Sequence, residues 1–143
     1  MGLRRDAREA AVQFLYQLDT HKPDDVPKAL AEFWRQNEAK PAVRDFANDL
    51  LHGALEKLPE IDRRIAALAD NWDFARLAAV DRNILRLALY EMLFRTEIPP
   101  VVSINEAIEI AKKFSTAESG KFVNGLLDRV KKDLLRPARQ PAG

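Results

Sequence analysis

Apolar residues recur every three or four positions along most of the chain, which is the spacing of one face of an α-helix. No stretch alternates apolar and polar residues in the way that a half-buried strand does. We therefore predict an all-α protein of about seven helices joined by short links. The helical patterns cover residues 5–18, 27–34, 43–58, 61–68, 80–94, 103–114 and 122–134.

The pattern over residues 80–94 differs from the others, because apolar residues cover most of the helix circumference. A helix that is apolar nearly all round is expected to lie buried at the centre of the protein. Its charged residues Asp81, Arg82 and Arg86 must share the small sector that remains. They support either a protein contact or salt bridges inside the bundle, and the sequence leaves both readings open.

Three local signals refine this picture. Ser103 and Glu106 have the spacing of a capping box, which predicts that the sixth helix begins at Ser103. Residues 70–77, between the fourth and fifth helices, are typical of a turn.

Gly125 lies inside the last helical pattern, where glycine costs about 1 kcal/mol relative to alanine. Close approach of a neighbouring helix would explain a glycine at that position.

Composition narrows the class of protein. The 143 residues fit one domain, and we expect a helical domain over residues 1–136 followed by a disordered tail over 137–143. The chain has no cysteine and no apolar run of the roughly 20 residues that span a bilayer, so we expect a cytoplasmic protein without a membrane partner.

The charge is unevenly distributed along the chain. The net charge is +1, yet residues 121–143 carry six basic and two acidic side chains, a local charge of +4. This excess favours either an anionic partner or a solvated helix end that complements the helix dipole.

No pattern of residues indicates catalysis. His21 and His52 lie far apart among polar residues, and no helix carries the histidine pair of a zinc protease. The chain has neither a glycine-rich phosphate loop nor a nucleophile elbow. We therefore expect no enzyme, with no catalytic residue, no metal and no cofactor, and we favour a binding module.

The first predicted helix opens with a basic cluster. Arg4 and Arg8 share one helix face, and Arg5 lies beside them. Guanidinium groups suit phosphate because each donates two parallel hydrogen bonds. If exposed, these arginines contribute little to stability. The alternative is a solvated first turn whose charge is cancelled by Asp6 and Glu9.

A second candidate lies where the last helix begins, in residues 115–125. A polar loop that leads into a helix presents free amides and the positive end of the helix dipole, which suit a phosphate. Lys121 adds a positive charge, and Phe122 suits stacking on an unpaired base. The alternative for Phe122 is packing in the core.

With these residues in view, the chain resembles the NusB family of bacterial transcription antitermination factors. The resemblance implies an all-helical fold of two small subdomains. It also implies binding of boxA RNA, a single-stranded element of leader and ribosomal RNA transcripts. The matching segments are RRDAREAAVQFLY at 4–16, DRNILRLALYE at 81–91, PPVVSINEAIEIAK at 99–112 and KFVNGLLD at 121–128.

The resemblance also implies partners. The family acts with a small-subunit ribosomal protein that doubles as NusE, and the pair helps RNA polymerase to read through terminators in ribosomal RNA operons. By motif position, Tyr16 and Asp81 lie near the contact with the ribosomal protein. The RNA-facing residues are Arg4, Arg5, Arg8, Glu118, Lys121 and Phe122. Asp6 interrupts the arginine cluster of the family, and Glu118 replaces a common aspartate.

Two other functions compete with this one. The first is a NusB-like helical domain accessory to a ribosomal RNA cytosine methyltransferase, an enzyme that needs a catalytic domain and a cysteine nucleophile. The chain has neither of them. The second is a protein-interaction bundle that does not bind RNA, or that forms a homodimer through its RNA surface.

Overall fold

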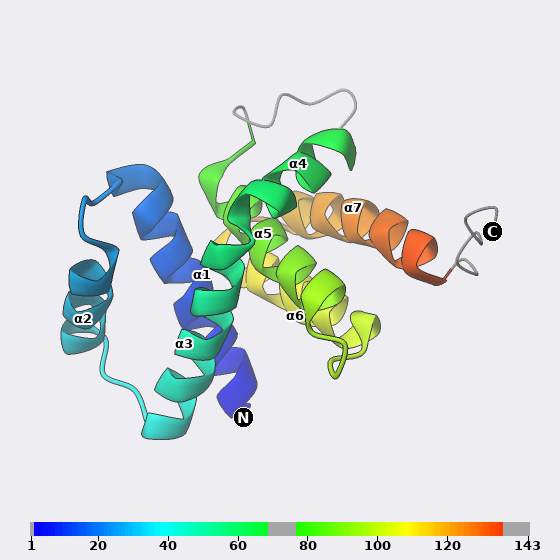
Figure 1. The fold of residues 1–143 in the computed structure, drawn as a ribbon. Coiled ribbons are helices and arrows are strands. Elements are labelled where there is room, and N and C mark those ends of the chain that lie inside the picture. Colours follow the sequence, from blue (N-terminus) through cyan, green and yellow to red (C-terminus); the bar gives the residue numbers. More distant parts are fainter. Residues whose placement is uncertain (1, 69–76, 136–143) are drawn as a thin grey trace, which may run out of the picture.

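The structure is a computed structural model that describes residues 2–68 and 77–135, and seven α-helices account for most of them (Figure 1). The all-α prediction is confirmed. The predicted turn at 70–77, apart from Leu77, and the predicted tail at 137–143 lie outside the described residues. The helices are α1 Leu3–His21, α2 Val26–Gln36, α3 Pro41–Glu56, α4 Leu58–Leu68, α5 Ala79–Phe94, α6 Pro100–Phe114 and α7 Ala117–Leu135.

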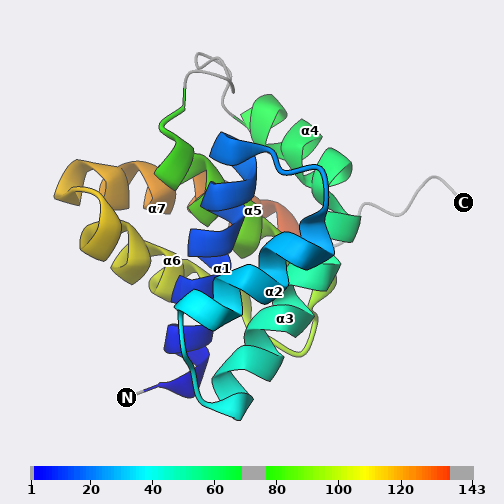
Figure 2. The same ribbon diagram turned by 90° about the vertical axis from the view of Figure 1, so that its left-hand side faces the viewer.

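The helices form two groups. In the first group, α3 packs along α1, and α2 lies on the outer side of that pair (Figure 2). In the second group, α6 packs against both α5 and α7, and α4 lies on α5. The two groups meet where α5 packs against α1 and α3, so α5 touches helices of both.

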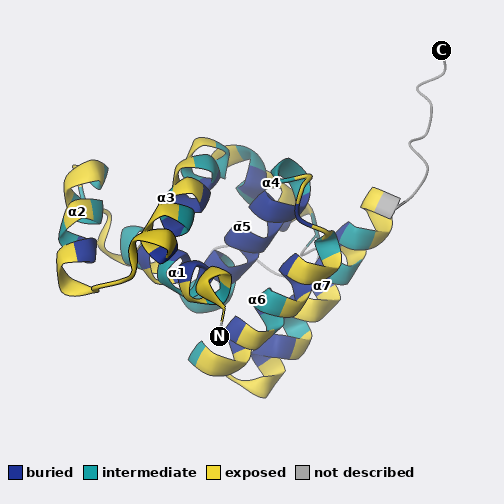
Figure 3. Cartoon of the chain, turned by 90° about the horizontal axis from the view of Figure 1, so that it is seen from below, coloured by how far each residue is buried: buried dark blue, intermediate teal, exposed yellow. Residues whose placement is uncertain are grey.

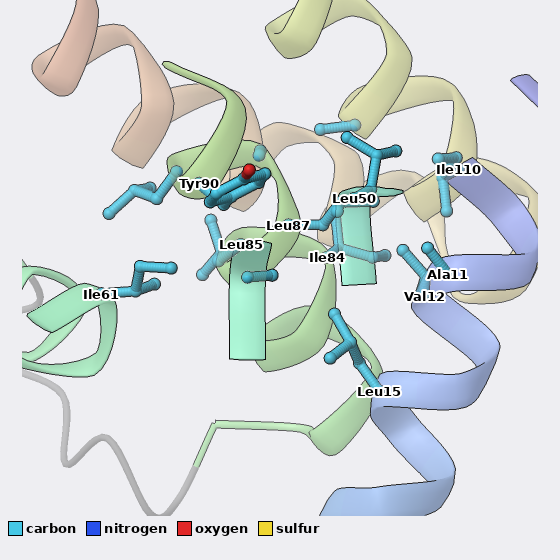
Figure 4. Packing of buried hydrophobic residues seen from close by; sticks show 14 of the residues in the cluster. Ala11, Val12, Leu15, Leu50, Ile61, Ile84, Leu85, Leu87, Tyr90 and Ile110 are labelled. Atoms are coloured by element: carbon cyan, nitrogen blue, oxygen red, sulfur yellow. The ribbon is translucent and has the colours of Figure 1, made fainter. Parts of the chain in front are cut away.

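The helix α5 is the centre of the core, as its apolar circumference predicts. Ten consecutive residues, Asn83–Met92, are buried, and α5 is dark along most of its length in Figure 3. Ile84 lies among Val12 and Leu15 of α1 and Leu50 of α3 in the close view of Figure 4. One continuous cluster of buried apolar side chains therefore joins both groups of helices.

The arginines of α5 form salt bridges inside the bundle. Arg82 lies 2.7 Å and Arg86 3.3 Å from the same Asp19 oxygen of α1, and Arg86 also pairs with Asp62 of α4 at 2.8 Å. Desolvation raises the pKa of Asp19, but hydrogen bonds from Arg82 and Asn83 outweigh it and hold that pKa below its usual range. Of the two readings of these arginines, the internal one is confirmed.

The predicted start of the sixth helix is wrong by three residues. The helix α6 begins at Pro100. Proline suits the first position of a helix, because the N–H groups of the first turn have no partner within the helix and the φ angle of proline is already helical. Ser103 is therefore already inside the helix, where its hydroxyl donates to Glu91 of α5 at 2.9 Å. Glu106 pairs with Arg5 of α1. The capping-box residues thus make tertiary contacts between helices.

Gly53 marks a point where α5 approaches α3 closely. A Cβ atom added to Gly53 would overlap the ring and the hydroxyl of Tyr90. Tyr90 is buried, and its ring stacks on Phe94 at 6.0 Å, so it has little room to move. A glycine is needed here for packing.

We expect Gly53→Ala to destabilise the protein by about 1–3 kcal/mol, because the added methyl group overpacks a full site. The loss should appear although alanine favours a helix by about 1 kcal/mol. Urea unfolding measures it. The effect of Gly53→Ala should be smaller when Tyr90→Ala removes the opposing ring. A Gly53→Ala protein as stable as the parent would contradict this account.

Candidate nucleic-acid interface

Arg8 lies inside the protein, which corrects the prediction that it is an exposed phosphate ligand. It is 3% exposed, and its Nε and Nη2 atoms each donate to a Glu91 carboxylate oxygen at 2.9 Å. Glu91 is buried in α5, and a buried carboxylate requires a cationic or hydrogen-bonding partner. Arg8 meets that need from the inward face of α1. In this structure it is not available to a phosphate.

Arg5 lies at the surface and is held in one orientation. Its Nε and Nη2 atoms donate to the two carboxylate oxygens of Glu106 at 3.0 and 2.7 Å, while 43% of its side chain is exposed. The hydrogen bonds from Arg5 hold the pKa of Glu106 below its usual range. Such a two-point contact fixes the plane of the guanidinium group. Arg5 therefore presents its remaining donor edge in a defined direction.

Arg4 is the exposed member of the cluster. Its guanidinium carbon lies 4.9 Å from the centre of the Phe46 ring of α3. A cation–π contact uses the face of the guanidinium group and leaves the N–H donors around its edge to water or phosphate. The three arginines of one predicted cluster thus have three different environments: buried, paired at the surface, and stacked at the surface.

A second site is a cavity of about 610 Å³ where α5 and α7 begin. Glu118, Lys121 and Phe122 of α7 line it, together with Leu77 and Asp81 near the start of α5. Phe122 is half-buried and packs against the core, which agrees with the packing alternative, and its stacking on a base stays a prediction. Lys121 is 78% exposed and lies 3.7 Å from Glu118. The residues that the sequence analysis assigned to RNA at this helix start therefore do lie together.

Asp81 belongs to the same cavity. Its carboxylate accepts a hydrogen bond from the Ser119 hydroxyl, which ties the first turn of α5 to the first turn of α7. A second contact fixes the start of α7, because the Ser119 amide donates to the Thr116 hydroxyl at 3.0 Å. Asp81, predicted at the protein contact, is thus also a wall of the predicted RNA site.

Tyr16 lies apart from that cavity on α1. Its side chain is 40% exposed, and it precedes by one turn the Asp19 that pairs with Arg82 of α5. Eleven residues of helix separate it from Arg5, or about 16 Å along the axis. The structure therefore separates Tyr16 from the N-terminal arginines and leaves its ring available at the surface.

The seam between α1 and α6 connects the arginines to the cavity. Arg5 meets Glu106 at one end of the seam, and Lys113 meets Glu9 at 2.8 Å further along. From Glu106 to Phe114, the last residue of α6, there are eight helical steps, or about 12 Å, and Ser115 and Thr116 at the cavity follow directly. Lys113 is a candidate that the sequence analysis missed, because a lysine in the last turn of a helix is equally typical of a residue that complements the helix dipole.

Two further observations concern the described part of the chain. Within residues 2–68 and 77–135, no group of three or more His, Cys, Asp or Glu side chains is placed to hold a metal ion. No helix in those ranges is long and apolar enough to cross a membrane.

The fold and the site together define a helical binding module with cations along one seam and a half-buried aromatic ring at its end. Comparison with known proteins gives the family. The model of the NusB family matches residues 5–132, and the chain belongs to this family.

Individual relatives agree with that assignment. The transcription antitermination protein NusB of Elusimicrobium minutum is 48% identical over 93% of this chain and 96% of its own. The structure is similar to T. maritima NusB, with a TM-score of 0.79 and 43% identity over 91% of each chain. It also matches a solved structure of antitermination factors NusB and NusE in complex with dsRNA, with a TM-score of 0.81 and 28% identity over 93% of this chain and 98% of that one.

We expect Arg8→Ala to destabilise the protein by about 3–5 kcal/mol, because it leaves the buried Glu91 carboxylate without its cation. Arg4→Ala, at an exposed position of the same helix, should cost less than about 1 kcal/mol. Urea unfolding of both variants tests the difference. Equal and small losses would show that Arg8 is not the partner that Glu91 requires. The sequence-based expectation that all three arginines matter little to stability is therefore replaced by one that sets Arg8 apart.

Proposed function

We propose that this protein is an RNA-binding transcription antitermination factor. It binds boxA RNA together with a small-subunit ribosomal protein, NusE, and promotes read-through by RNA polymerase in ribosomal RNA operons. The observation that carries the proposal is a series of surface cations in a member of the NusB family: Arg4 and Arg5 on α1, Lys113 in the α1–α6 seam, and Lys121 at the cavity of Phe122. Arg5, Lys113 and Lys121 each also pair with a glutamate. A relative has been solved in complex with NusE and dsRNA, which supports both partners.

In the proposed complex, Arg4, Arg5 and Lys121 bind phosphates of the RNA. An unpaired base enters the cavity and stacks on Phe122, which lines it, since every base offers a π face to an aromatic ring. Glu118 lines the same cavity and accepts a hydrogen bond from a base amino group. Arg8 acts indirectly, by fixing α1 on α5 through Glu91.

The protein contact involves Tyr16 and Asp81. Tyr16 offers an exposed ring, a residue type enriched at protein interfaces. The ribosomal protein binds where the C-terminal half of α1 lies near the start of α5. This surface adjoins the RNA cavity, because Asp81 is common to both sites. RNA polymerase belongs to the larger assembly on which this pair acts.

The competing functions have less support. Curated relatives align over nearly their whole length under the name of antitermination protein, and the family is one of non-enzymatic factors. This favours the factor over an accessory domain of a methyltransferase. A homodimer formed through the RNA surface is the remaining alternative, and RNA would compete with it.

We expect Arg4→Ala and Lys121→Ala each to weaken boxA RNA binding and to reduce its salt dependence, because each phosphate contact releases about one counterion. Stability should change little, since exposed cations contribute little to it. Fluorescence anisotropy over a series of salt concentrations measures both effects. Arg35→Ala on α2, where Arg35 is exposed, is the matched control and should bind RNA like the parent.

Phe122→Ala completes this series and should lose about 1–3 kcal/mol of RNA binding at every salt concentration, because stacking does not release counterions. Gel filtration with and without RNA shows whether a homodimer competes. If Arg4→Ala, Lys121→Ala and Phe122→Ala all bind RNA as tightly as Arg35→Ala does, the proposed RNA surface is wrong.

We expect Tyr16→Ala to weaken binding of the ribosomal protein while RNA binding by the protein alone stays unchanged. Asp81→Lys should weaken both, because Asp81 holds Ser119 at the wall of the RNA cavity. Calorimetry with each partner separates the two variants. Parental affinity of Tyr16→Ala for the ribosomal protein would place the contact elsewhere, and an Asp81→Lys variant with normal RNA binding would show that the two sites are independent.

A further inference from the structure

Gly125 lies inside the long helix α7, and no contact among the described residues explains why a glycine stands there. It is the ninth residue of α7, counted from Ala117, and it is exposed. A Cβ atom added there would meet no atom within 4 Å, whereas one added to Gly53 would overlap Tyr90. The expected close approach of a neighbouring helix is therefore wrong for Gly125. Glycine disfavours a helix, so its presence at an open position calls for an external cause.

The surface around Gly125 is polar and cationic. Lys121 lies four residues before Gly125, Asp128 three after it and Lys132 seven after it, which places them along the same side of α7. Asn124 adjoins that side, because it is three residues from Lys121 and four from Asp128. All are exposed except Asp128, which is half-buried and pairs with Lys132 at 3.2 Å. Exposed residues recur along α7 in Figure 3. This side of the helix offers hydrogen-bond donors, and its large apolar side chain, Phe122, is half-buried and lines the RNA cavity.

The stripe is continuous with the RNA cavity, because Lys121 belongs to both. Within the stripe, Lys121 and Lys132 are cationic and Asp128 is acidic, so its net charge is positive and complements an anionic chain. A protein partner needs several apolar anchors to be held firmly, whereas this side of the described part of α7 offers the half-buried Phe122 alone. A nucleic-acid backbone needs cations, hydrogen-bond donors and space to approach the helix. Lys121 and Lys132 supply the cations, Asn124 supplies amide donors, and the open space at Gly125 allows the approach.

We propose that the sugar–phosphate backbone of the bound RNA crosses α7 at Gly125, in direct contact with the helix backbone. This rests on the proposed function and extends the RNA path beyond the cavity of Phe122. The missing Cβ atom lets a ribose approach the carbonyl groups of the helix, to which a 2′-hydroxyl donates. Lys121 and Asn124 flank the crossing and bind the adjoining phosphates.

The test uses a substitution that should improve the free protein and impair the complex. Gly125→Ala should raise the Tm by about 3 °C, because alanine favours the helix and meets no atom. It should weaken boxA RNA binding by about fivefold or more, because the methyl group occupies the point of contact. Gly125→Gln should weaken it further. Ala31→Gln, at an exposed position of α2, adds similar bulk away from the stripe and should bind normally.

The outcomes separate this inference from the proposed function. A more stable Gly125→Ala protein with parental RNA affinity, in a series where Lys121→Ala weakens binding, would overturn the crossing at Gly125 and leave the RNA site intact. A series in which neither variant changes RNA affinity would overturn both. Loss of affinity for the ribosomal protein with RNA affinity intact would assign the stripe to protein and overturn the crossing. A lowered Tm would show that the glycine serves the fold and would likewise overturn it.

Discussion

The buried carboxylate of Glu91 constrains the whole arrangement. It is 1% exposed in the middle of α5, where an unpaired charge would cost several kcal/mol. Arg8 of α1 compensates it with two hydrogen bonds, and Ser103 of α6 donates a third. Three helices from distant parts of the chain are thereby joined at one group. Since no buried side-chain nitrogen or oxygen among the described residues lacks a hydrogen-bond partner, this polar centre is compatible with a tightly packed core.

The same contact sets the geometry of the surface. With Arg8 directed inward, two neighbouring side chains of α1 reach α6, where Arg5 pairs with Glu106 and Glu9 pairs with Lys113. The cations that remain outside line a seam that ends at the cavity of α5 and α7. One arginine of the N-terminal cluster thus stabilises the fold, and its neighbours are left for the proposed phosphates. Arg8 stabilises the fold because it is buried beside Glu91, whereas Arg4 and Arg5, less than two helical turns away, lie at the surface where a phosphate can reach them.

Two glycines in helices show how the same residue type answers different constraints. At Gly53 the space for a side chain is filled by Tyr90, so the requirement arises from packing inside the protein. At Gly125 that space is open, and the requirement that we propose arises from a bound partner. Helix propensity alone assigns the same penalty to both positions. Only the positions of neighbouring atoms distinguish them.

The sequence by itself determined the local features: the seven helices of the described residues, their approximate ends, and the burial of α5. Helical periodicity and an apolar circumference depend on residues that are close together in the chain. The motifs also located the residues around Lys121 and Phe122, which are adjacent in the chain. Only the tertiary structure decided that Arg8 faces Glu91, that Ser103 and Glu106 bind other helices instead of capping their own, and that Asp81 shares a cavity with Lys121. The physical reason is that a local pattern specifies the face on which a side chain lies, whereas its partner is set by the packing of helices that are distant in sequence.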